Sequence, residues 1–286
     1  AQLPDADAVV TEALEIGSEE LALALKLKVV QNFGLDTRNI DLEACARAGV
    51  QTPVFRRRIN GVVGEHVIAL MLAVGRKICE TNGALDFASL EALGYKPAMF
   101  DTDHISGGNW ARVTGLKKLQ GSTRGAFGLG EVGREVASRA KAMGMQIIYH
   151  QRRQLAPEVE AEWNAEYVSF DDMLARADFV SIHVPLNDAT RGMVDATAFA
   201  RMKDGAILIN ASRAHIVDRD ALIAALDSGR LGGAGFDVQY QEPLTGEESL
   251  KDYPNVVLSP HIAVGPRTEA LADMEEIIAN LAAAVN

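Results

Sequence analysis

The sequence predicts an α/β fold: a doubly wound parallel sheet, accompanied by a second and smaller α/β domain. Two observations carry this prediction. A glycine-rich turn, Gly128-x-Gly130-x-x-Gly133, lies between a short apolar run and a stretch with helical spacing. From that turn onward, six short apolar runs alternate with segments that fit helices. Strands joined in this way by crossover helices form a parallel sheet.

The length and composition are those of a folded protein with room for two domains. The chain has 286 residues, 48% of them apolar and 23% charged. Its net charge is −11, and the longest basic run is Arg56-Arg57-Arg58, so nucleic acid is not an expected partner. No apolar run reaches the length expected of a membrane span, and no signal-peptide pattern is found. Cys45 and Cys79 are expected to be reduced thiols, which predicts a cytoplasmic protein without a metal site.

The first third of the chain predicts the smaller domain. Short apolar runs indicate strands at residues 8–10, 27–31 and 50–55, and helical spacing indicates helices at 19–26 and 41–48. A longer helix follows at about residues 62–80 and is apolar on most sides. Such a helix is usually buried, so we expect it to join the two domains. Residues 84–119 show little periodicity and predict a helix fragment and a loop.

The remainder of the chain predicts the larger domain, over residues 63–264, and a return to the smaller one. Strands are expected at residues 126–127, 146–149, 179–184, 206–209, 234–238 and 256–258. Helices are expected in the gaps, notably at 171–177 and 220–228, and the helix after the glycine turn should stop at Gly144. The last helix, 268–285, is amphipathic, so residues 1–62 and 265–286 form the smaller domain in this interpretation.

The three glycines of the turn have a chemical explanation. One permits the tight turn, one lets the backbone approach a pyrophosphate, and one lets the helix pack closely on the strand. The free N–H groups and positive dipole end of the following helix then favour phosphate. An ordinary strand-to-helix turn can carry the same pattern. The flanking strands and helix favour dinucleotide binding.

Four polar side chains fall near the carboxyl ends of the later strands, where ligands bind in such sheets. They are Arg213, Asp237, Glu242 and His261. Arginine can hold a carboxylate with two hydrogen bonds, and histidine can give or take a proton near neutral pH. A neighbouring carboxylate can orient an imidazole and keep it protonated. Each residue alone is more often structural, but together they indicate a site for acid–base chemistry beside a nicotinamide ring.

These residues carry a specific resemblance to the D-isomer-specific 2-hydroxyacid dehydrogenases. The motifs are Gly128-Leu-Gly-Glu-Val-Gly133, His183-Val-Pro-Leu186, Asn210-Ala-Ser-Arg213, Gly233-Ala-Gly-Phe-Asp-Val238, Glu242-Pro243 and Pro260-His261-Ile-Ala263. Asn39-Ile-Asp41 and the helix that contains Glu65-His66 resemble the substrate domain of the same family. The resemblance covers nearly the whole chain. It implies a Rossmann cofactor domain, a flavodoxin-like substrate domain and the reversible reduction of a small 2-keto acid to a D-2-hydroxy acid.

The resemblance also implies roles for individual residues. Arg213 binds the substrate carboxylate and carbonyl, His261 is the acid/base and Glu242 pairs with it. The backbone around Gly34, Leu35 and Asp36 holds the substrate from the smaller domain. The expected cofactor contacts are Gly128, Leu129, Gly130, Glu131, Val132, Gly133, His150, Gln151, Arg152, Arg153, His183, Val184, Pro185, Asn210, Ala211, Ser212, Arg213, Asp237, His261 and Ala263. Family members are usually homodimers, so a homodimer is expected.

The second strand of the cofactor domain predicts which dinucleotide is used. An NAD-specific fold places an Asp or Glu at the end of this strand to bind the ribose hydroxyls. Here the strand continues as His150-Gln151-Arg152-Arg153, with no carboxylate to repel a 2′-phosphate and two guanidinium groups that suit one. The stretch resembles the NADPH-preferring glyoxylate and hydroxypyruvate reductases of the family. The prediction is NADP(H), with NAD(H) as the weaker option and the alternative that both arginines are only solvated.

Two further departures from the family pattern affect the smaller domain. Family members usually carry another strand and helix ahead of the stretch that matches Ala6-Asp7-Ala8, so this domain is expected to be incomplete. Arg56 and Arg57 replace the usual Pro-Gly turn. They are either solvated or, in part, directed at a polar or anionic group of the substrate. The alternatives for the whole chain are a dinucleotide-sensing corepressor and a phosphoglycerate dehydrogenase-like enzyme. A formate dehydrogenase would carry glutamine in place of Glu242.

Overall fold

The chain consists of two compact units in a computed structural model that describes residues 3–12, 14–99, 108–265 and 267–285. The small unit comprises Ala1–Val62 and Val264–Asn286, and the large unit comprises Val63–Ala263. Val264, expected in the larger domain, falls in the small unit. Part of the segment expected as a helix fragment and loop, residues 100–107, lies outside the described residues.

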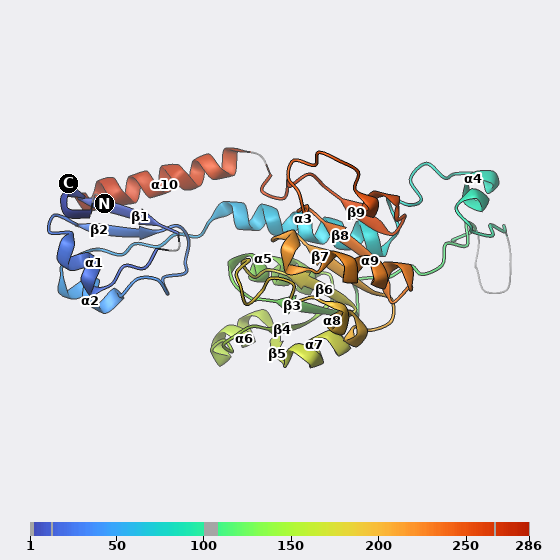
Figure 1. Ribbon diagram of the computed structural model, residues 1–286, viewed down its shortest axis with the longest axis horizontal. Helices are drawn as coiled ribbons and strands as arrows, with labels where there is room; N and C mark the ends of the chain where they lie inside the picture. The colour runs from blue at the N-terminus through green and yellow to red at the C-terminus, as the bar shows by residue number, and fades with distance from the viewer. Residues whose placement is uncertain (1–2, 13, 100–107, 266, 286) are drawn as a thin grey trace. The chain divides into compact units, whose positions relative to one another are not determined.

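The large unit contains a seven-stranded parallel sheet, which confirms the doubly wound fold class (Figure 1). Its strands are β3 (Thr123–Phe127), β4 (Gln146–His150), β5 (Ala165–Tyr167), β6 (Phe179–Ile182), β7 (Ala206–Asn210), β8 (Leu231–Phe236) and β9 (Val256–Leu258). Their order across the sheet is β5-β4-β3-β6-β7-β8-β9. The direction of winding reverses between β3 and β6, and ligands bind at such a reversal, outside the carboxyl ends of the strands.

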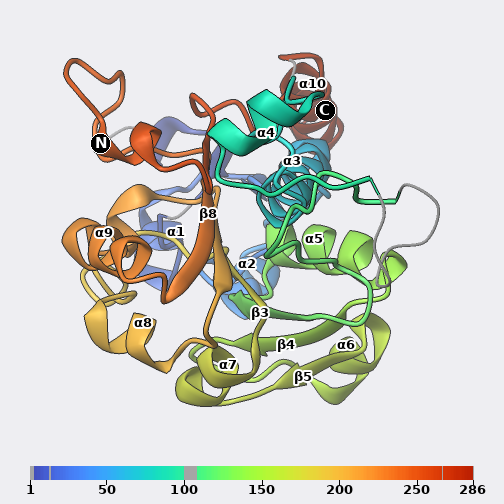
Figure 2. The ribbon, with the colours of Figure 1, turned by 90° about the vertical axis from the view of Figure 1, so that its right-hand side faces the viewer.

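Helices cover both faces of this sheet, as Figure 2 shows. Those of the large unit are α3 (Arg58–Gly75, which begins in the small unit), α4 (Phe87–Ala92), α5 (Glu131–Ala142), α6 (Pro157–Trp163), α7 (Phe170–Arg176), α8 (Ala196–Arg201) and α9 (Arg219–Asp227). Side chains of α3 and α5 form one core with the sheet, and those of α7, α8 and α9 form the other. Successive residues of a strand point to opposite faces. Ala126 accordingly packs in the α5 core and Phe127 in the α7 core.

Helix α3 is long and apolar enough to cross a membrane, contrary to the expectation from the sequence. Length and composition alone do not distinguish such a span from the core helix of a globular fold, and half of this helix is buried. Val67, Leu70, Met71 and Val74 pack against the sheet. A Cβ placed on Gly235 of β8 would lie 3.1 Å from Leu70, so helix and strand are in close contact. These contacts identify α3 as a core helix of the large unit.

The small unit is an α/β layer with its own core (Figure 1). Strands β1 (Ala8–Thr11) and β2 (Val29–Asn32) pair in parallel, with α1 (Ser18–Leu23), α2 (Leu42–Arg47) and α10 (Arg267–Val285) around them. Asp41 caps α2 by accepting a hydrogen bond from the Ala44 N–H at 2.8 Å. Helix α10 packs on β2, and Asn280 Nδ2 donates to Gln31 Oε1. The two ends of the chain therefore build one unit.

The prediction of a strand at residues 50–55 is wrong. In this segment, an isolated bridge between Val29 and Gln51 takes the place of a strand. Pro53 has no N–H for a ladder, and its carbonyl accepts from the Gln31 side chain instead. Helix α3 also runs four to five residues earlier than expected. The carboxylate of Asp273 accepts from the Arg58 N–H at its start. Beyond its end, Lys77 adopts a left-handed φ of 53°.

Candidate active site

The glycine turn connects β3 to α5 and leaves space for a phosphate group. Gly128 has a φ of +86°, and a Cβ there would lie 2.9 Å from the His183 carbonyl oxygen. A Cβ on Gly133 would lie 2.4 Å from the Gly128 carbonyl oxygen, so this helix residue packs directly on the turn. A Cβ on Gly130, the N-cap of α5, would meet nothing within 4 Å. The open space therefore lies at the N-terminus of the helix, where a pyrophosphate fits.

The end of β4 is tied to the glycine turn. The Gly128 N–H donates to the His150 carbonyl at 2.9 Å, and the Leu129 N–H donates to Gln151 Oε1 at 3.0 Å. His150 Nδ1 donates to the carbonyl of Val168, the residue after β5, so this ring contacts the protein on that side. Arg152 and Arg153 are exposed, and no ion pair holds either side chain within the described part of the chain. Both guanidinium groups are thus available to an anion beside the turn.

The segment after β6 lies on the other side of the reversal point. The His183 N–H donates to the Phe127 carbonyl at 2.8 Å, which holds this segment beside the glycine turn. The Val184 carbonyl accepts from Ser212 Oγ at 2.7 Å and so links the ends of β6 and β7. His183 Nε2 is occupied by Ser181 and Arg124. Pro185 follows as an exposed residue.

The loop after β7 presents Arg213 and is held by Asn210. The Asn210 side chain accepts from the Ser212 N–H at 3.0 Å and donates to the Arg213 carbonyl at 2.9 Å. Arg213 itself is exposed, and among the described residues its guanidinium donates only to the Ser212 carbonyl. The backbone is fixed while the cationic side chain remains accessible. This arrangement can hold a carboxylate with two hydrogen bonds.

His261 and Glu242 form a hydrogen-bonded pair. His261 Nδ1 lies 2.7 Å from Glu242 Oε2, and the other carboxylate oxygen accepts from the Gln239 N–H at 2.7 Å. Burial opposes ionisation of Glu242, but the Gln239 N–H, His261 and the Arg213 charge together hold the pKa of this carboxyl below its ordinary value. Glu242 is therefore a carboxylate at neutral pH. With Nδ1 directed at Glu242, His261 has Nε2 left for a substrate.

Asp237, at the end of β8, anchors the loop that carries His261. This carboxylate is fully buried and accepts from Ser259 Oγ at 2.6 Å, the Ile262 N–H at 2.9 Å and the Ala263 N–H at 2.8 Å. His66 of α3 lies 2.9 Å from Ser259 Oγ and 3.3 Å from the same Asp237 oxygen. The loop needs this support because His261 has a left-handed φ of 56°, which is unfavourable for a non-glycine residue.

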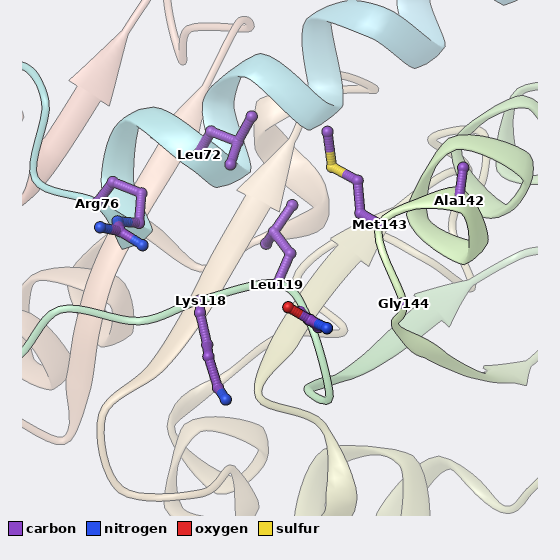
Figure 3. Close-up of a pocket in the computed structure, with 8 residues that line it drawn as sticks. Leu72, Arg76, Lys118, Leu119, Ala142, Met143 and Gly144 are labelled. Carbon is purple, nitrogen blue, oxygen red and sulfur yellow. The ribbon is translucent and has the colours of Figure 1, made fainter.

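The catalytic residues expected from the sequence meet in one hollow of about 230 Å³. Its lining includes Arg213, Glu242 and His261, with Tyr240 and His215 beside them. A larger hollow of about 570 Å³ lies elsewhere on the large unit, between the end of α3 and the end of α5 (Figure 3). Arg76 and Lys118 line it, but it contains no acid–base pair. The smaller hollow is therefore the candidate active site, because it contains the acid–base pair, although its volume is less.

The substrate residues expected outside this hollow belong to the small unit. Gly34, Leu35 and Asp36 follow β2, and the Asn32 amide donates to the Asp36 carbonyl. The guanidinium of Arg57 lies 4.2 Å from the Phe33 ring centroid, so this arginine stacks beside the same loop. Arg58 is used differently, because it pairs with Asp273 and Glu276 of α10. Arg56 is exposed.

Three residues of the site were not predicted as site residues from the sequence. Ser259 and His66 support the His261 loop, and their signal exists only in three dimensions because 193 positions separate them. Arg124 is the second residue of β3 and is fully buried. A charged residue within an apolar strand next to a glycine turn is unusual. That sequence signal could have identified Arg124.

Comparisons with known proteins agree with this geometry. Residues 94–263 match the family described as D-isomer specific 2-hydroxyacid dehydrogenase, NAD binding domain. A glyoxylate reductase of Thermococcus litoralis is 38% identical over 96% of this chain and 79% of its own length. The 4-methyl-2-oxopentanoate reductase A of Aspergillus oryzae is 37% identical over 92% of this chain and 73% of its own. The crystal structure of a glyoxylate reductase from Paecilomyes thermophila superposes with a TM-score of 0.67 at 31% identity, covering 100% of this chain and 82% of the other.

Proposed function

Since the chain belongs to the D-isomer-specific 2-hydroxyacid dehydrogenase family, we propose that it is a small 2-keto acid reductase that prefers NADP(H). The observation that carries the proposal is the meeting of Arg213, Glu242 and His261 in one hollow. The family fixes the coarser activity, a 2-hydroxyacid dehydrogenase that uses a nicotinamide cofactor. The similarity to glyoxylate reductases favours a short keto acid such as glyoxylate or hydroxypyruvate.

Each residue of the hollow has a separate role in the reaction. Arg213 binds the substrate carboxylate and polarises the adjacent carbonyl, since its guanidinium is exposed and forms no ion pair with a described residue. When bound, the nicotinamide supplies hydride to the carbonyl carbon. His261 gives a proton from Nε2 to the carbonyl oxygen, which becomes the hydroxyl of the product. Glu242 stabilises the imidazolium through Nδ1 and fixes the orientation of the ring.

The proposed preference for NADP(H) rests on the last residue of β4 and on the residues that follow it. His150 stands where an NAD-specific fold has a carboxylate, and its ring is already hydrogen bonded to Val168. A neutral or cationic imidazole does not repel a 2′-phosphate. Arg152 and Arg153 are exposed beside it and carry no ion pair in the described chain. Their fork-shaped groups match the geometry of a phosphate.

Arg57 supports a polar extension on the substrate. Its guanidinium is only partly exposed, lies over Phe33 and is 3.6 Å from Glu12. The side chain is thereby fixed beside the loop of Gly34, Leu35 and Asp36, the part of the small unit that we propose for substrate binding. A hydroxyl-bearing keto acid such as hydroxypyruvate would offer this arginine a further partner beside Glu12.

We also propose that the protein is a cytoplasmic homodimer. Large apolar side chains are exposed along one stretch of the large unit, at Ile78, Leu85, Phe87, Leu93 and Met99. Such a density of apolar surface is typical of an interface. Cys45 and Cys79 are both free, which fits a reducing compartment. Sedimentation of the purified protein at twice the monomer mass would support the dimer, and a monomer would exclude it.

A substrate panel tests the proposed function. Glyoxylate, hydroxypyruvate, 4-methyl-2-oxopentanoate and 3-phosphohydroxypyruvate are each offered with NADPH, and the configuration of any chiral product is determined. We expect the highest kcat/KM with glyoxylate or hydroxypyruvate, and a D product from hydroxypyruvate. Binding of cofactor without turnover of any keto acid would contradict the proposal and favour a dinucleotide sensor. Turnover of only the phosphorylated substrate would contradict the proposed substrate class.

A further inference from the structure

The buried arginine of β3 lies directly behind the glycine turn. Arg124 is 0% exposed, and its guanidinium reaches Ser181 of β6 and His183, which follows the end of that strand. Arg124 Nε donates to Ser181 Oγ at 2.9 Å, Nη2 lies 2.7 Å from His183 Nε2, and Nη1 lies 3.4 Å from the Gly133 carbonyl oxygen. The guanidinium is thus enclosed by the end of β6 and the first turn of α5.

No negative charge in the described chain compensates this guanidinium. Its hydrogen-bond partners are a hydroxyl, a carbonyl and an imidazole. The imidazole of His183 cannot share the charge, because burial and the neighbouring Arg124 hold the pKa of His183 well below its ordinary value. Burial lowers the pKa of Arg124 to about 9, so it remains a cation at neutral pH. A buried charge without an opposite charge is costly, and proteins seldom retain one without a use.

The location makes the charge still less favourable in the empty protein. Gly133 belongs to the first turn of α5, and the N-terminus of a 12-residue helix already carries a positive partial charge. A cation behind this terminus adds to the same positive potential. An anion in front of the terminus would offset both, and the open space at Gly130 is in front of it.

We propose that Arg124 is an additional cofactor-binding residue, which acts from behind the glycine turn as the counter-charge of the dinucleotide pyrophosphate. This inference rests on the proposed use of a nicotinamide dinucleotide. The side chain needs no contact with the ligand, because the backbone of the turn separates them and the low-dielectric surroundings transmit the attraction. It contributes to binding of NADPH and NADH alike, since both carry the pyrophosphate. The preference for NADPH over NADH depends on Arg152 and Arg153 in this proposal, and not on Arg124.

Two substitutions of Arg124 distinguish the effect of its positive charge from the effect of its hydrogen bonds. Arg124→Lys and Arg124→Gln both lose the fork of hydrogen bonds to Ser181 and His183, but only the first keeps the charge. The probes are ADP-ribose, which carries the pyrophosphate, and adenosine 2′-monophosphate, which does not. Titration calorimetry at neutral pH measures both affinities, and the melting temperature of each empty variant shows that it is folded.

We expect Arg124→Gln to bind ADP-ribose, NADPH and NADH roughly tenfold or more weakly, by a common factor. Arg124→Lys should stay within a few-fold of the wild type, and adenosine 2′-monophosphate should bind all three proteins equally. Equal losses in both variants, a loss for adenosine 2′-monophosphate as well, or no loss in Arg124→Gln would each overturn the proposal. A wild type that binds neither ADP-ribose nor NADPH would instead overturn the proposed function itself, and this inference with it.

Discussion

At the scale of single residues, the candidate site depends on a few side chains held by their neighbours. His261 and Glu242 hydrogen bond to each other, and Asp237 fixes the loop beneath them. Arg213 reaches the same hollow from a different strand. The sequence could predict these residues because parallel strands bring their carboxyl ends to one edge. It could not predict the role of His66, whose contact with Ser259 arises only once α3 is packed on the sheet.

Removal of the imidazole tests whether His261 is the general acid of the reaction. His261→Ala should lower kcat roughly a hundredfold or more, the usual contribution of a positioned general acid. The glycine turn is separate from His261, so the affinity for NADPH should change little. Steady-state rates and a cofactor titration on the same sample measure both. Near-normal turnover would exclude His261 as the acid.

The effect of the Glu242 carboxylate should be visible in the pH dependence of the reduction rate. The pKa of Glu242 is lowered, so its stabilisation of the imidazolium is present at neutral pH and is lost only as the pH falls through that lowered pKa. Reduction requires protonated His261 and therefore declines as the pH rises. Glu242→Gln removes the negative charge that favours the imidazolium, and we expect the decline to move toward lower pH. An unmoved profile would mean that Glu242 has only a structural role.

The guanidinium of Arg213 should not be replaceable by an ammonium group. Arg213→Lys keeps the charge but loses the two parallel hydrogen bonds to a carboxylate. We expect a higher KM for the keto acid and a lower kcat, with the KM for NADPH nearly unchanged. A change confined to the cofactor would place Arg213 in the dinucleotide site and not on the substrate.

At the scale of elements, the turn between β3 and α5 is the feature that sequence reasoning predicted most completely. Gly128 has the positive φ of a tight turn, Gly133 packs on it, and Gly144 has a φ of +77° where α5 ends. Glycine requirements of this kind are local, so a sequence reveals them. The three-residue strand β5 was missed because it is too short to show a period. The strand expected at residues 50–55 failed because Pro53 interrupts its ladder.

Two glycines of this turn should respond differently to the same methyl group. Gly130→Ala adds a Cβ in open space, so the melting temperature should change little while NADPH affinity falls at least tenfold through obstruction of the pyrophosphate. Gly133→Ala places a Cβ 2.4 Å from the Gly128 carbonyl oxygen. Such overpacking typically costs ~1–3 kcal/mol. We therefore expect a lower melting temperature and weaker binding together. Full affinity in Gly130→Ala would show that no phosphate occupies this space.

At the scale of the whole molecule, the sequence could predict the doubly wound sheet and the family, since apolar runs and motif order extend along the chain. Assignment of residues 268–285 to the small unit also follows from amphipathic spacing, and α10 does pack on β2. The proposed dimerisation depends on surface complementarity, and the choice of physiological keto acid depends on substrate fit. Those properties are not encoded in the period of apolar residues or in a short motif.

The proposed NADP(H)-dependent reduction of a short keto acid is tested by the ratio of kcat/KM for NADPH to that for NADH, with glyoxylate as the substrate. This ratio is measured on the wild type and on the double variant Arg152→Ala, Arg153→Ala. We expect a wild-type ratio well above one, and a fall of at least tenfold in the double variant through loss of NADPH use with little change for NADH. A wild type that uses NADH equally well or better, or a double variant with an unchanged ratio, would contradict the proposal.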